Sequence, residues 1–215
     1  MNSIRSIPYL SEFLTVVVVH LLGVMSPGPD FIMISRNSLV YSKRTGIYSA
    51  VGLGLGIVVH VTYSLIGIGY IISKSILIFS CLKLLGAGYL IYIGYKSLLA
   101  KPQTIKAGEG GEHKDLGWRA SVRMGFLTNV SNPKATLFFF ALFTQVINPH
   151  TPKIIQILYG LEMSVMTFIW FALVAVILSH RYVKARFSAA QHHVEQVFGV
   201  VLIALGIKVA LSTSK

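Results

Sequence analysis

The sequence predicts an all-α integral membrane protein with six transmembrane helices, built as two inverted three-helix repeats in which helices 1 and 4 are broken at proline motifs. The first observation is composition, because 54% of the residues are apolar and 12% are charged, with a mean hydropathy of +0.70. Soluble domains carry about a quarter of charged residues, so this composition is typical of a membrane protein. The other two observations are a set of long apolar stretches and a proline break inside two of them.

The apolar stretches lie near residues 9–40, 47–72, 76–99, 119–148, 153–179 and 194–212. Each is long enough for a helix of about 20 residues, which crosses a hydrocarbon core of ~30 Å. A long polar linker at 101–117 lies between the third and the fourth stretch. We therefore expect a single transmembrane domain over 1–215, with a first repeat at 1–100 and a second at 118–215.

The first stretch could also be a secretory signal, because the apolar run from Phe13 to Met25 follows Arg5. No small-x-small cleavage pattern precedes Ser26, and the break that follows has a counterpart later in the chain. We expect the segment to be retained as the first membrane helix.

The first break is Ser26-Pro27-Gly28-Pro29-Asp30. Both prolines lack a backbone donor, and glycine allows dihedral angles that a substituted residue would resist. This pattern predicts an unwound corner, followed by a half-helix that begins near Pro29 and points its free N–H groups into a cavity.

The second break is Ser131-Asn132-Pro133-Lys134. Asparagine is a good N-cap and proline suits the first position of a helix, so a half-helix should begin at Pro133. Two helix N-termini would then converge near the middle of the membrane. Their partial positive charge suits an anion such as a carboxylate.

The two halves of the sequence resemble each other. The segment 90–99 aligns with 202–211 at an offset of 112, with five identical residues of ten, and Pro29 aligns with Pro133 at an offset of 104. Asp30 then aligns with Lys134. Two three-helix units in one chain enter the membrane in opposite senses, which gives the inverted repeats found in many secondary transporters.

Basic residues gather in alternate connections between the stretches. One side of the membrane would hold Arg36, Lys43, Arg44, Lys96, Lys101, Lys106, Lys114, Arg119, Arg123, Arg181, Lys184 and Arg186. The other side and the two termini hold Arg5, Lys74, Lys153, Lys208 and Lys215. Cytoplasmic loops are enriched in basic residues, so we expect both termini outside the cell.

Asp30 and Lys134 are ionisable residues beside breaks in apolar segments, where a charge is costly and marks a functional site. One interpretation is that they bracket a zwitterion, with Asp30 near an ammonium group and Lys134 near a carboxylate. Another is a structural ion pair between the two, which would partly offset the cost of burial. Both stay open, because a substrate could separate the pair during transport.

Other polar residues are weaker candidates. His20 and His60 lie in apolar stretches and could relay protons, although a hydrogen-bonded packing role is the commoner state of such histidines. We expect Glu12 and Glu162 near helix ends, where a carboxylate is solvated. Gly52, Gly54 and Gly56 predict close helix contact, with a homodimer as the lesser option.

Several function classes are disfavoured. The net charge of +12 could suggest nucleic acid, but the basic residues lie in short connections and form no stripe, so we expect no nucleic-acid partner. A lone Cys81 leaves no disulfide framework. The sequence contains no P-loop, so we expect no cofactor and an ion gradient or substrate exchange as the energy source.

Four segments together carry a family resemblance. They are Ser26-Pro27-Gly28-Pro29-Asp30-Phe31, the glycine-rich segment 46–56, Leu85-Gly86-Ala87-Gly88-Tyr89-Leu90 and Asn132-Pro133-Lys134-Ala135. In this order, over nearly the full chain, they resemble the LysE/RhtB family of bacterial amino-acid exporters. The resemblance implies a protein of the bacterial inner membrane that exports amino acids or close derivatives such as homoserine, threonine, lysine or leucine, coupled to the proton gradient. It does not fix the substrate, because the wider superfamily includes exporters of metal cations.

We expect the substrate site to be formed by both breaks, from Pro27, Gly28, Pro29, Asp30, Asn132, Pro133 and Lys134, with no metal. An exporter of metal cations is an alternative, but it would need a compact set of carboxylate, histidine or thiol ligands, and Lys134 would repel the cation. A membrane-embedded enzyme is a further alternative, but no His-Asp-Ser constellation is apparent in the sequence.

Overall fold

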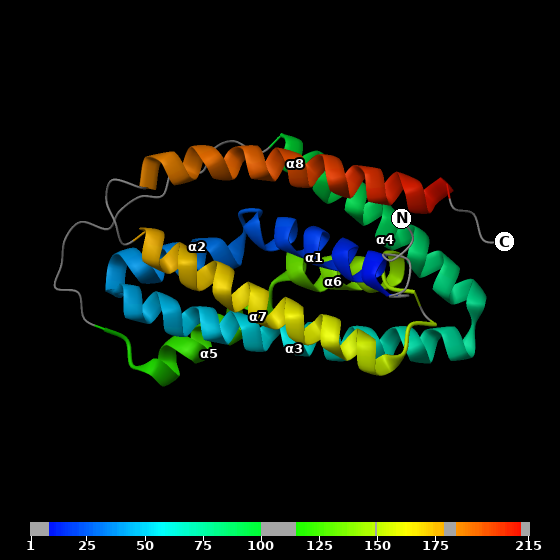
Figure 1. The fold of residues 1–215 in the computed structure, drawn as a ribbon, viewed down its shortest axis with the longest axis horizontal. Coiled ribbons are helices and arrows are strands. Elements are labelled where there is room, and N and C mark those ends of the chain that lie inside the picture. The colour runs from blue at the N-terminus through cyan, green and yellow to red at the C-terminus, as the bar shows by residue number, and fades with distance from the viewer. Residues whose placement is uncertain (1–8, 100–114, 149, 179–183, 212–215) are drawn as a thin grey trace, which may run out of the picture.

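The computed structural model describes residues 9–99, 115–148, 150–178 and 184–211, and these residues form helices joined by short connections, with no strand among them (Figure 1). The helices are α1 (Leu10–Met25), α2 (Pro29–Arg36), the π-helix η2 (Asn37–Tyr41), α3 (Lys43–Lys74), α4 (Ile76–Leu98), α5 (Trp118–Val130), α6 (Pro133–Gln145), α7 (Lys153–Leu178) and α8 (Lys184–Leu211). The prediction of an all-helical chain is confirmed for this part of the sequence.

The helices match the apolar stretches of the sequence. Each predicted stretch holds one helix or one broken pair, and α8 begins at Lys184, before the predicted start at 194. Most of the predicted linker, residues 100–114, lies outside the described residues.

Both proline motifs break their helices as the sequence predicts. The axes of α1 and of the segment Pro29–Tyr41 differ by 55° across the first break. At the second break, α5 and α6 have 13 residues each. A helix of this length is about 20 Å long, so neither piece alone crosses a bilayer.

Successive segments alternate in direction along the long axis of the molecule (Figure 1). The pair α1 and α2 runs from right to left in this view, α3 runs back, and α4 runs from right to left again. The pair α5 and α6, then α7, then α8 follow in the opposite sense, beginning from the left. Both breaks lie in the middle of the molecule.

In the part of the chain that the structure describes, two helices are long and apolar enough to cross a membrane by themselves. They are the Lys43–Gly67 part of α3 and the whole of α7, and the bent pair of α1 with the segment Pro29–Tyr41 counts as a third if it is one span. Spans of this length and composition are typical of a multi-pass membrane protein. The number of six crossings stays a prediction.

Gly52, Gly54 and Gly56 of α3 lie where α3 packs closely against other helices of the same chain. Gly52 and Gly56 face α5, and a Cβ atom added at Gly56 would lie 2.8 Å from the Cβ of Asn129. Gly54 faces α7, where a Cβ atom would lie 3.0 Å from the Ser164 carbonyl oxygen. The prediction of close helix contact at these glycines is confirmed, because both faces of α3 are packed against its neighbours.

The helices α4 and α8 form a second closely packed pair. A Cβ atom at Gly94 would lie 2.6 Å from the Gly199 carbonyl oxygen, and one at Gly206 would lie 2.8 Å from the Ala87 carbonyl oxygen. This pair contacts α6 and α1, whereas α3 packs mainly on α5 and α7.

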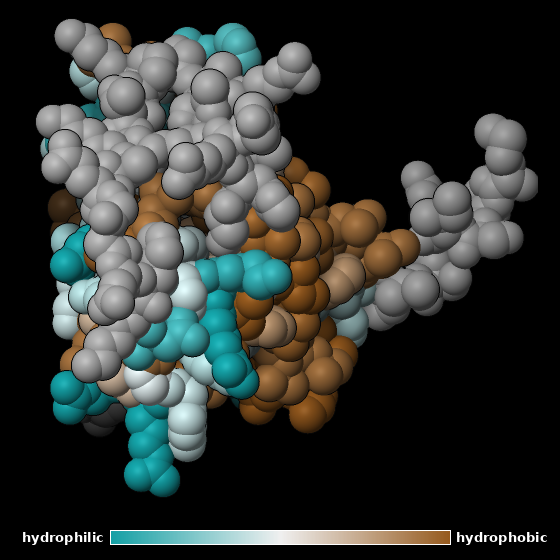
Figure 2. All heavy atoms as spheres, turned by 90° about the vertical axis from the view of Figure 1, so that its left-hand side faces the viewer, coloured by the Kyte–Doolittle hydropathy of each residue, from teal (hydrophilic) through white to brown (hydrophobic). Residues whose placement is uncertain are grey.

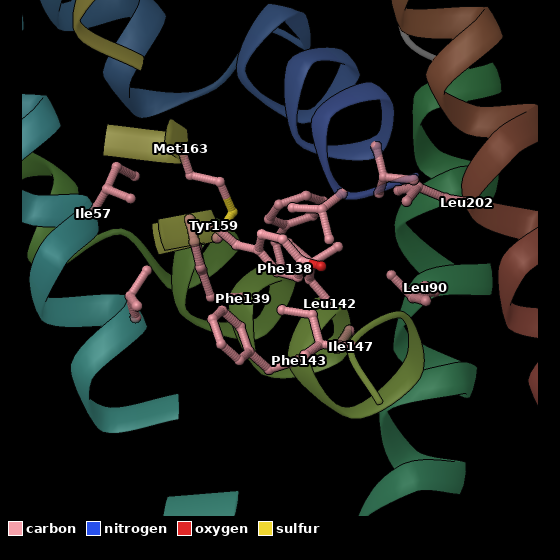
Figure 3. Close-up of a cluster of buried hydrophobic side chains, with 14 of the residues drawn as sticks. Ile57, Leu90, Phe138, Phe139, Leu142, Phe143, Ile147, Tyr159, Met163 and Leu202 are labelled. Carbon is pink, nitrogen blue, oxygen red and sulfur yellow. The ribbon is translucent and has the colours of Figure 1, made fainter. Parts of the chain in front are cut away.

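The core contains two apolar clusters. The larger surrounds Phe138 and Phe139 of α6 and takes side chains from helices on every side (Figure 3). The smaller joins Phe31 and Ile34 of α2 to α3 and α7. The half-helices that follow the breaks are therefore held in the centre of the molecule.

Charged residues mark one end of the molecule. Exposed arginine and lysine side chains lie where α2 ends and where α3 and α5 begin, namely Arg36, Lys43, Arg44, Arg119 and Arg123. Figure 2 looks onto this end and shows hydrophilic side chains beside an apolar flank. The flank carries large exposed apolar side chains, as expected of a surface that faces lipid.

Candidate functional site

A cavity of about 50 Å³ lies between the two breaks. A buried water needs about 10–15 Å³ by this measure, so the cavity has room for a few small groups. Its wall includes residues from all eight α-helices of the described chain. Four predicted site residues line it, namely Gly28, Asp30, Asn132 and Lys134, and aromatic rings of Phe31, Phe138, Phe139, Phe171 and Phe198 close most of the rest.

The half-helix predicted after the first break is present, but Gly28 does not have the special backbone dihedral angles that the sequence predicts. α2 begins at Pro29, as expected, and Gly28 is its N-cap. Gly28 has φ −171° and ψ −171°, an extended conformation that any residue adopts, so the expectation of special dihedral angles was wrong. Its hydrogen atoms instead face Lys134, whose Cδ would lie 3.4 Å from an added Cβ.

The second break is formed as the sequence predicts. Asn132 caps α6, because its side-chain Oδ1 accepts a hydrogen bond of 3.0 Å from the Lys134 backbone N–H, and Pro133 occupies the first position of the helix. A capped N-terminus therefore points at the cavity.

Lys134 joins the two breaks directly. Its Nζ donates to the Ser26 hydroxyl over 2.7 Å and to the Pro27 carbonyl oxygen over 2.9 Å, and it lies 5.7 Å from the centre of the Phe198 ring. The carbonyl groups at the end of α1 have lost helical partners because of the prolines, and a cation at a helix C-terminus is favourable. The ammonium group thus satisfies the oxygens that the first break leaves free.

Asp30 has one satisfied and one unsatisfied oxygen. Its Oδ2 accepts a hydrogen bond of 2.8 Å from Asn129 Nδ2, whereas its buried Oδ1 has no hydrogen-bond partner in the described part of the chain. Within the same residues, no N–O contact of 4.0 Å or less joins Asp30 to Lys134. The direct ion pair considered from the sequence is therefore not formed in this structure.

Asn129 is a polar residue of the site that the sequence interpretation missed. It is buried in the last turn of α5, and its backbone carbonyl oxygen lies 3.0 Å from His60 Nε2. The available signal was an amide side chain in an apolar stretch, one turn before the second break. It went unused because the direction in which the helix presents that face depends on packing.

The two histidines differ in position. Both ring nitrogens of His60 have partners, since Nδ1 lies 2.7 Å from the Tyr63 hydroxyl, and its ring stacks on Phe139 at 5.4 Å. His20 lines the cavity, with Nε2 at 3.3 Å from Thr167 Oγ1 and Nδ1 without a hydrogen-bond partner. His60 thus holds the end of α5, and His20 presents a free nitrogen.

The three prolines do not line the cavity. Pro27 contributes through its carbonyl oxygen, which accepts from Lys134, and Pro29 and Pro133 occupy the first positions of α2 and α6. They shape the site without facing it.

A second missed residue is Glu195 on α8. Its side chain is 7% exposed, it precedes Phe198 by one helical turn, and it attracts Lys134 electrostatically. The sequence placed it in the sixth apolar stretch, but only the packing of α8 on α6 brings it near the site.

Of the two acidic residues expected near helix ends, Glu12 lies where predicted and Glu162 does not. Glu12 lies in the first turn of α1, as predicted, and accepts from Asn148 N–H over 3.0 Å and from the Thr151 hydroxyl over 2.9 Å. Glu162 lies well inside the 26-residue helix α7, so the expectation of a position near a helix end was wrong.

Groups of opposite charge line the same cavity. A carboxylate oxygen without a partner, an ammonium group and a capped helix N-terminus surround one cavity with apolar walls. Among the described residues, no group of three or more His, Cys, Asp or Glu side chains could hold a metal ion.

Comparisons with known proteins agree with this geometry. The chain is 26% identical to a threonine efflux protein of Escherichia coli (strain K12) over 205 residues, which cover 94% of this chain and 99% of the relative. It is 27% identical to an uncharacterised membrane protein, YrhP, of Bacillus subtilis (strain 168) over 210 residues, which cover 94% and 100%. No solved structure matches the chain.

A family model described as LysE type translocator matches residues 21–213. The match includes both breaks and every residue that lines the cavity, except His20. The chain is therefore a multi-pass membrane protein that belongs to the LysE type translocator family.

Proposed function

We propose that this protein exports an amino acid or a close derivative, of the homoserine, threonine, lysine or leucine type, and that the proton gradient drives the export. It would act as a secondary transporter and not as an enzyme. The observation that carries this proposal is the buried, unpartnered Asp30 Oδ1 in a cavity whose other charged group is Lys134. Family membership and the relatives named threonine efflux protein support it.

Asp30 would bind the ammonium group of the substrate. A buried carboxylate oxygen without a partner carries a large desolvation cost, and a hydrogen bond from an ammonium group removes that cost. Asn129 would hold Asp30 in place, because it donates to Oδ2 and leaves Oδ1 free.

Lys134 and the N-terminus of α6 would bind the substrate carboxylate. In this structure the Lys134 ammonium donates to Ser26 and Pro27, so a carboxylate must compete with those oxygens. Binding would then weaken the contact between the two breaks. This competition links substrate binding to movement of the first break against the second.

The proposed architecture is six crossings in two inverted repeats, 1–100 and 118–215. The alternating directions of the segments and the two central breaks support it (Figure 1). The breaks would then lie near the membrane midplane, where transporters with inverted repeats bind their substrates.

The contacts at the two ends support an inward-facing state. The first turn of α1 is tied to the connection between α6 and α7, because Glu12 accepts from the Asn148 N–H and the Thr151 hydroxyl. Toward the left-hand end, neither α4 nor α8 has an extensive contact with α2 or α5 within the described residues. Export would proceed by closing this side and opening the other.

The basic left-hand end would face the cytoplasm, which puts both termini outside, in the bacterial inner membrane. His20, with its free Nδ1 at the cavity, would relay protons. His60 would support this path indirectly, since its Nε2 contacts the Asn129 carbonyl oxygen while its Nδ1 is bonded to the Tyr63 hydroxyl.

An exporter of metal cations remains the second candidate class at the level of the superfamily. Lys134 opposes it, because an ammonium group beside Asp30 would repel a cation. A thermal-shift screen of the purified protein against amino acids and divalent metals separates the classes. Stabilisation by metals alone would overturn the proposal.

The direct test is counterflow in proteoliposomes with labelled threonine, homoserine, lysine and leucine. We expect Asp30→Asn and Lys134→Ala to abolish counterflow while the protein stays in the membrane. Gly67→Ala serves as control, because nothing lies within 4 Å of a Cβ atom at that position. Full counterflow by a well-expressed double mutant would rule out the assigned site.

A further inference from the structure

Glu162 is an acidic residue inside the membrane helix α7 and outside the cavity between the breaks. It follows Lys153 by nine residues, which is about 14 Å along the helix axis at 1.5 Å per residue. The whole helix is about 39 Å long, so a hydrocarbon core of ~30 Å centred on it would begin about 5 Å from its end. Glu162 would then lie about 9 Å inside the core.

Its carboxyl group has no polar partner. Both Oε1 and Oε2 are buried and neither has a hydrogen bond in the described part of the chain. An ionised carboxylate in such a place is strongly unfavourable, and intramembrane acidic residues mark ion or proton pathways. The neutral carboxylic acid is the form that suits this environment.

Among the described residues, no ion pair replaces the missing hydrogen bonds of the Glu162 carboxyl group. α7 itself carries Lys153 and Tyr159, and it packs against α1, α2, η2 and α3. Those four helices carry the titratable or basic residues Glu12, His20, Asp30, Arg36, Tyr41, Lys43, Arg44, Tyr48, His60, Tyr63, Tyr70 and Lys74. Asp30 and His60 are bonded to Asn129, and Glu12 is bonded to Thr151.

The position of Glu162 is suited to affect helix packing. One side of the same turn contacts α3, through Gly160 against Val61 and the Ser164 hydroxyl, which donates to the Gly54 carbonyl oxygen over 2.7 Å. Ionisation of Glu162 would require water or a cation at this depth, and hence a shift of α7. A proton can therefore bias the arrangement of α7 against α3.

We propose that Glu162 is the proton-binding site that couples transport to the proton gradient. A proton from the outer side bonds to one carboxylate oxygen and gives the neutral acid. The same O–H bond breaks when the proton leaves toward the cytoplasm, so no electrons are transferred. This inference rests on the proposed function, and it assigns the coupling step to a residue away from the substrate cavity.

The test compares two assays on the full-length protein in proteoliposomes, with whichever of the four labelled amino acids wild type carries. Counterflow needs no proton gradient, whereas accumulation against a gradient does. One pH unit can drive about tenfold accumulation per proton. We expect Glu162→Gln to keep counterflow and to lose that accumulation, and Glu162→Asp to restore part of it.

Two controls separate coupling from general damage. Glu12→Gln makes the same chemical change on α1 and should keep the ratio of driven accumulation to counterflow. His20→Gln tests the other candidate proton carrier. If His20→Gln alone loses driven accumulation while Glu162→Gln keeps it, the assignment to Glu162 is wrong.

An infrared measurement tests proton binding without any substrate. Wild type should show the carbonyl stretch of a protonated carboxylic acid at neutral pH, and this band should be absent in Glu162→Gln. A band that persists unchanged in Glu162→Gln contradicts the proposal. If wild type carries none of the amino acids, the proposed function fails, whereas the infrared band still decides whether Glu162 holds a proton.

Discussion

The side chain of Asn129 donates a hydrogen bond of 2.8 Å to Asp30 and so ties the last turn of α5 to the first turn of α2. The two residues belong to different halves of the sequence. Together with the contact of Lys134 to Ser26 and Pro27, this bond makes one polar network out of two helix breaks. The network satisfies Asp30 Oδ2 and Lys134 Nζ and leaves Asp30 Oδ1 free for a ligand.

Replacement of Asn129 by alanine should destabilise the protein. The change removes the donor to Asp30 and leaves a buried carboxylate without any partner, a loss of about 1–3 kcal/mol. Thermal unfolding in detergent measures it. In the Asp30→Asn background the same replacement should cost less, and equal costs in both backgrounds would show that the bond contributes nothing.

Replacement of Ser26 by alanine should tighten substrate binding. It removes one acceptor from the Lys134 ammonium, and a hydrogen bond to a charged group contributes about 1.5–3 kcal/mol, or roughly tenfold or more in affinity. The substrate carboxylate would then compete with one acceptor fewer for the Lys134 ammonium group. Equilibrium binding of the labelled substrate measures the change, and weaker binding would mean that Ser26 itself holds the substrate.

Replacement of Gly52 by alanine should strongly destabilise the fold. An added Cβ would collide with the Val122 carbonyl oxygen and lie 2.6 Å from the Phe126 backbone nitrogen, neither of which can move alone. Gly67→Ala in the same helix has open space and should be neutral or stabilising by up to about 1 kcal/mol. Similar melting temperatures for the two variants would contradict the packing of α3 on α5.

Cysteine labelling should reveal the orientation. After Cys81→Ser, a cysteine at exposed Arg119 should react with a membrane-impermeant maleimide only from the cytoplasmic side. A cysteine at exposed Lys153 should react only from outside. Labelling of intact cells and of inverted vesicles distinguishes the two, and the reverse pattern would place both termini in the cytoplasm.

Local features of this protein were predictable because they depend on neighbours in the chain. The breaks, the start of α2 at Pro29 and the cap of α6 by Asn132 follow from proline and asparagine chemistry within a few residues. The closeness of Gly52, Gly54 and Gly56 to other helices follows from the lack of side chains. The special dihedral angle expected at Gly28 failed, because the corner is extended there and the crowding comes from Lys134.

The sequence by itself determined the membrane class, the positions of the helices and their breaks, and the two residues Asp30 and Lys134 that line the cavity between them. Only the tertiary structure decided their partners. It turned Lys134 toward Ser26 and Pro27 instead of Asp30 and placed Asn129 between Asp30 and His60. It also left the buried carboxyl oxygens of Glu162 without a hydrogen-bond partner among the described residues. The physical reason is that a helix break depends on adjacent residues, whereas a buried charge takes its partner from whichever helix the packing brings beside it.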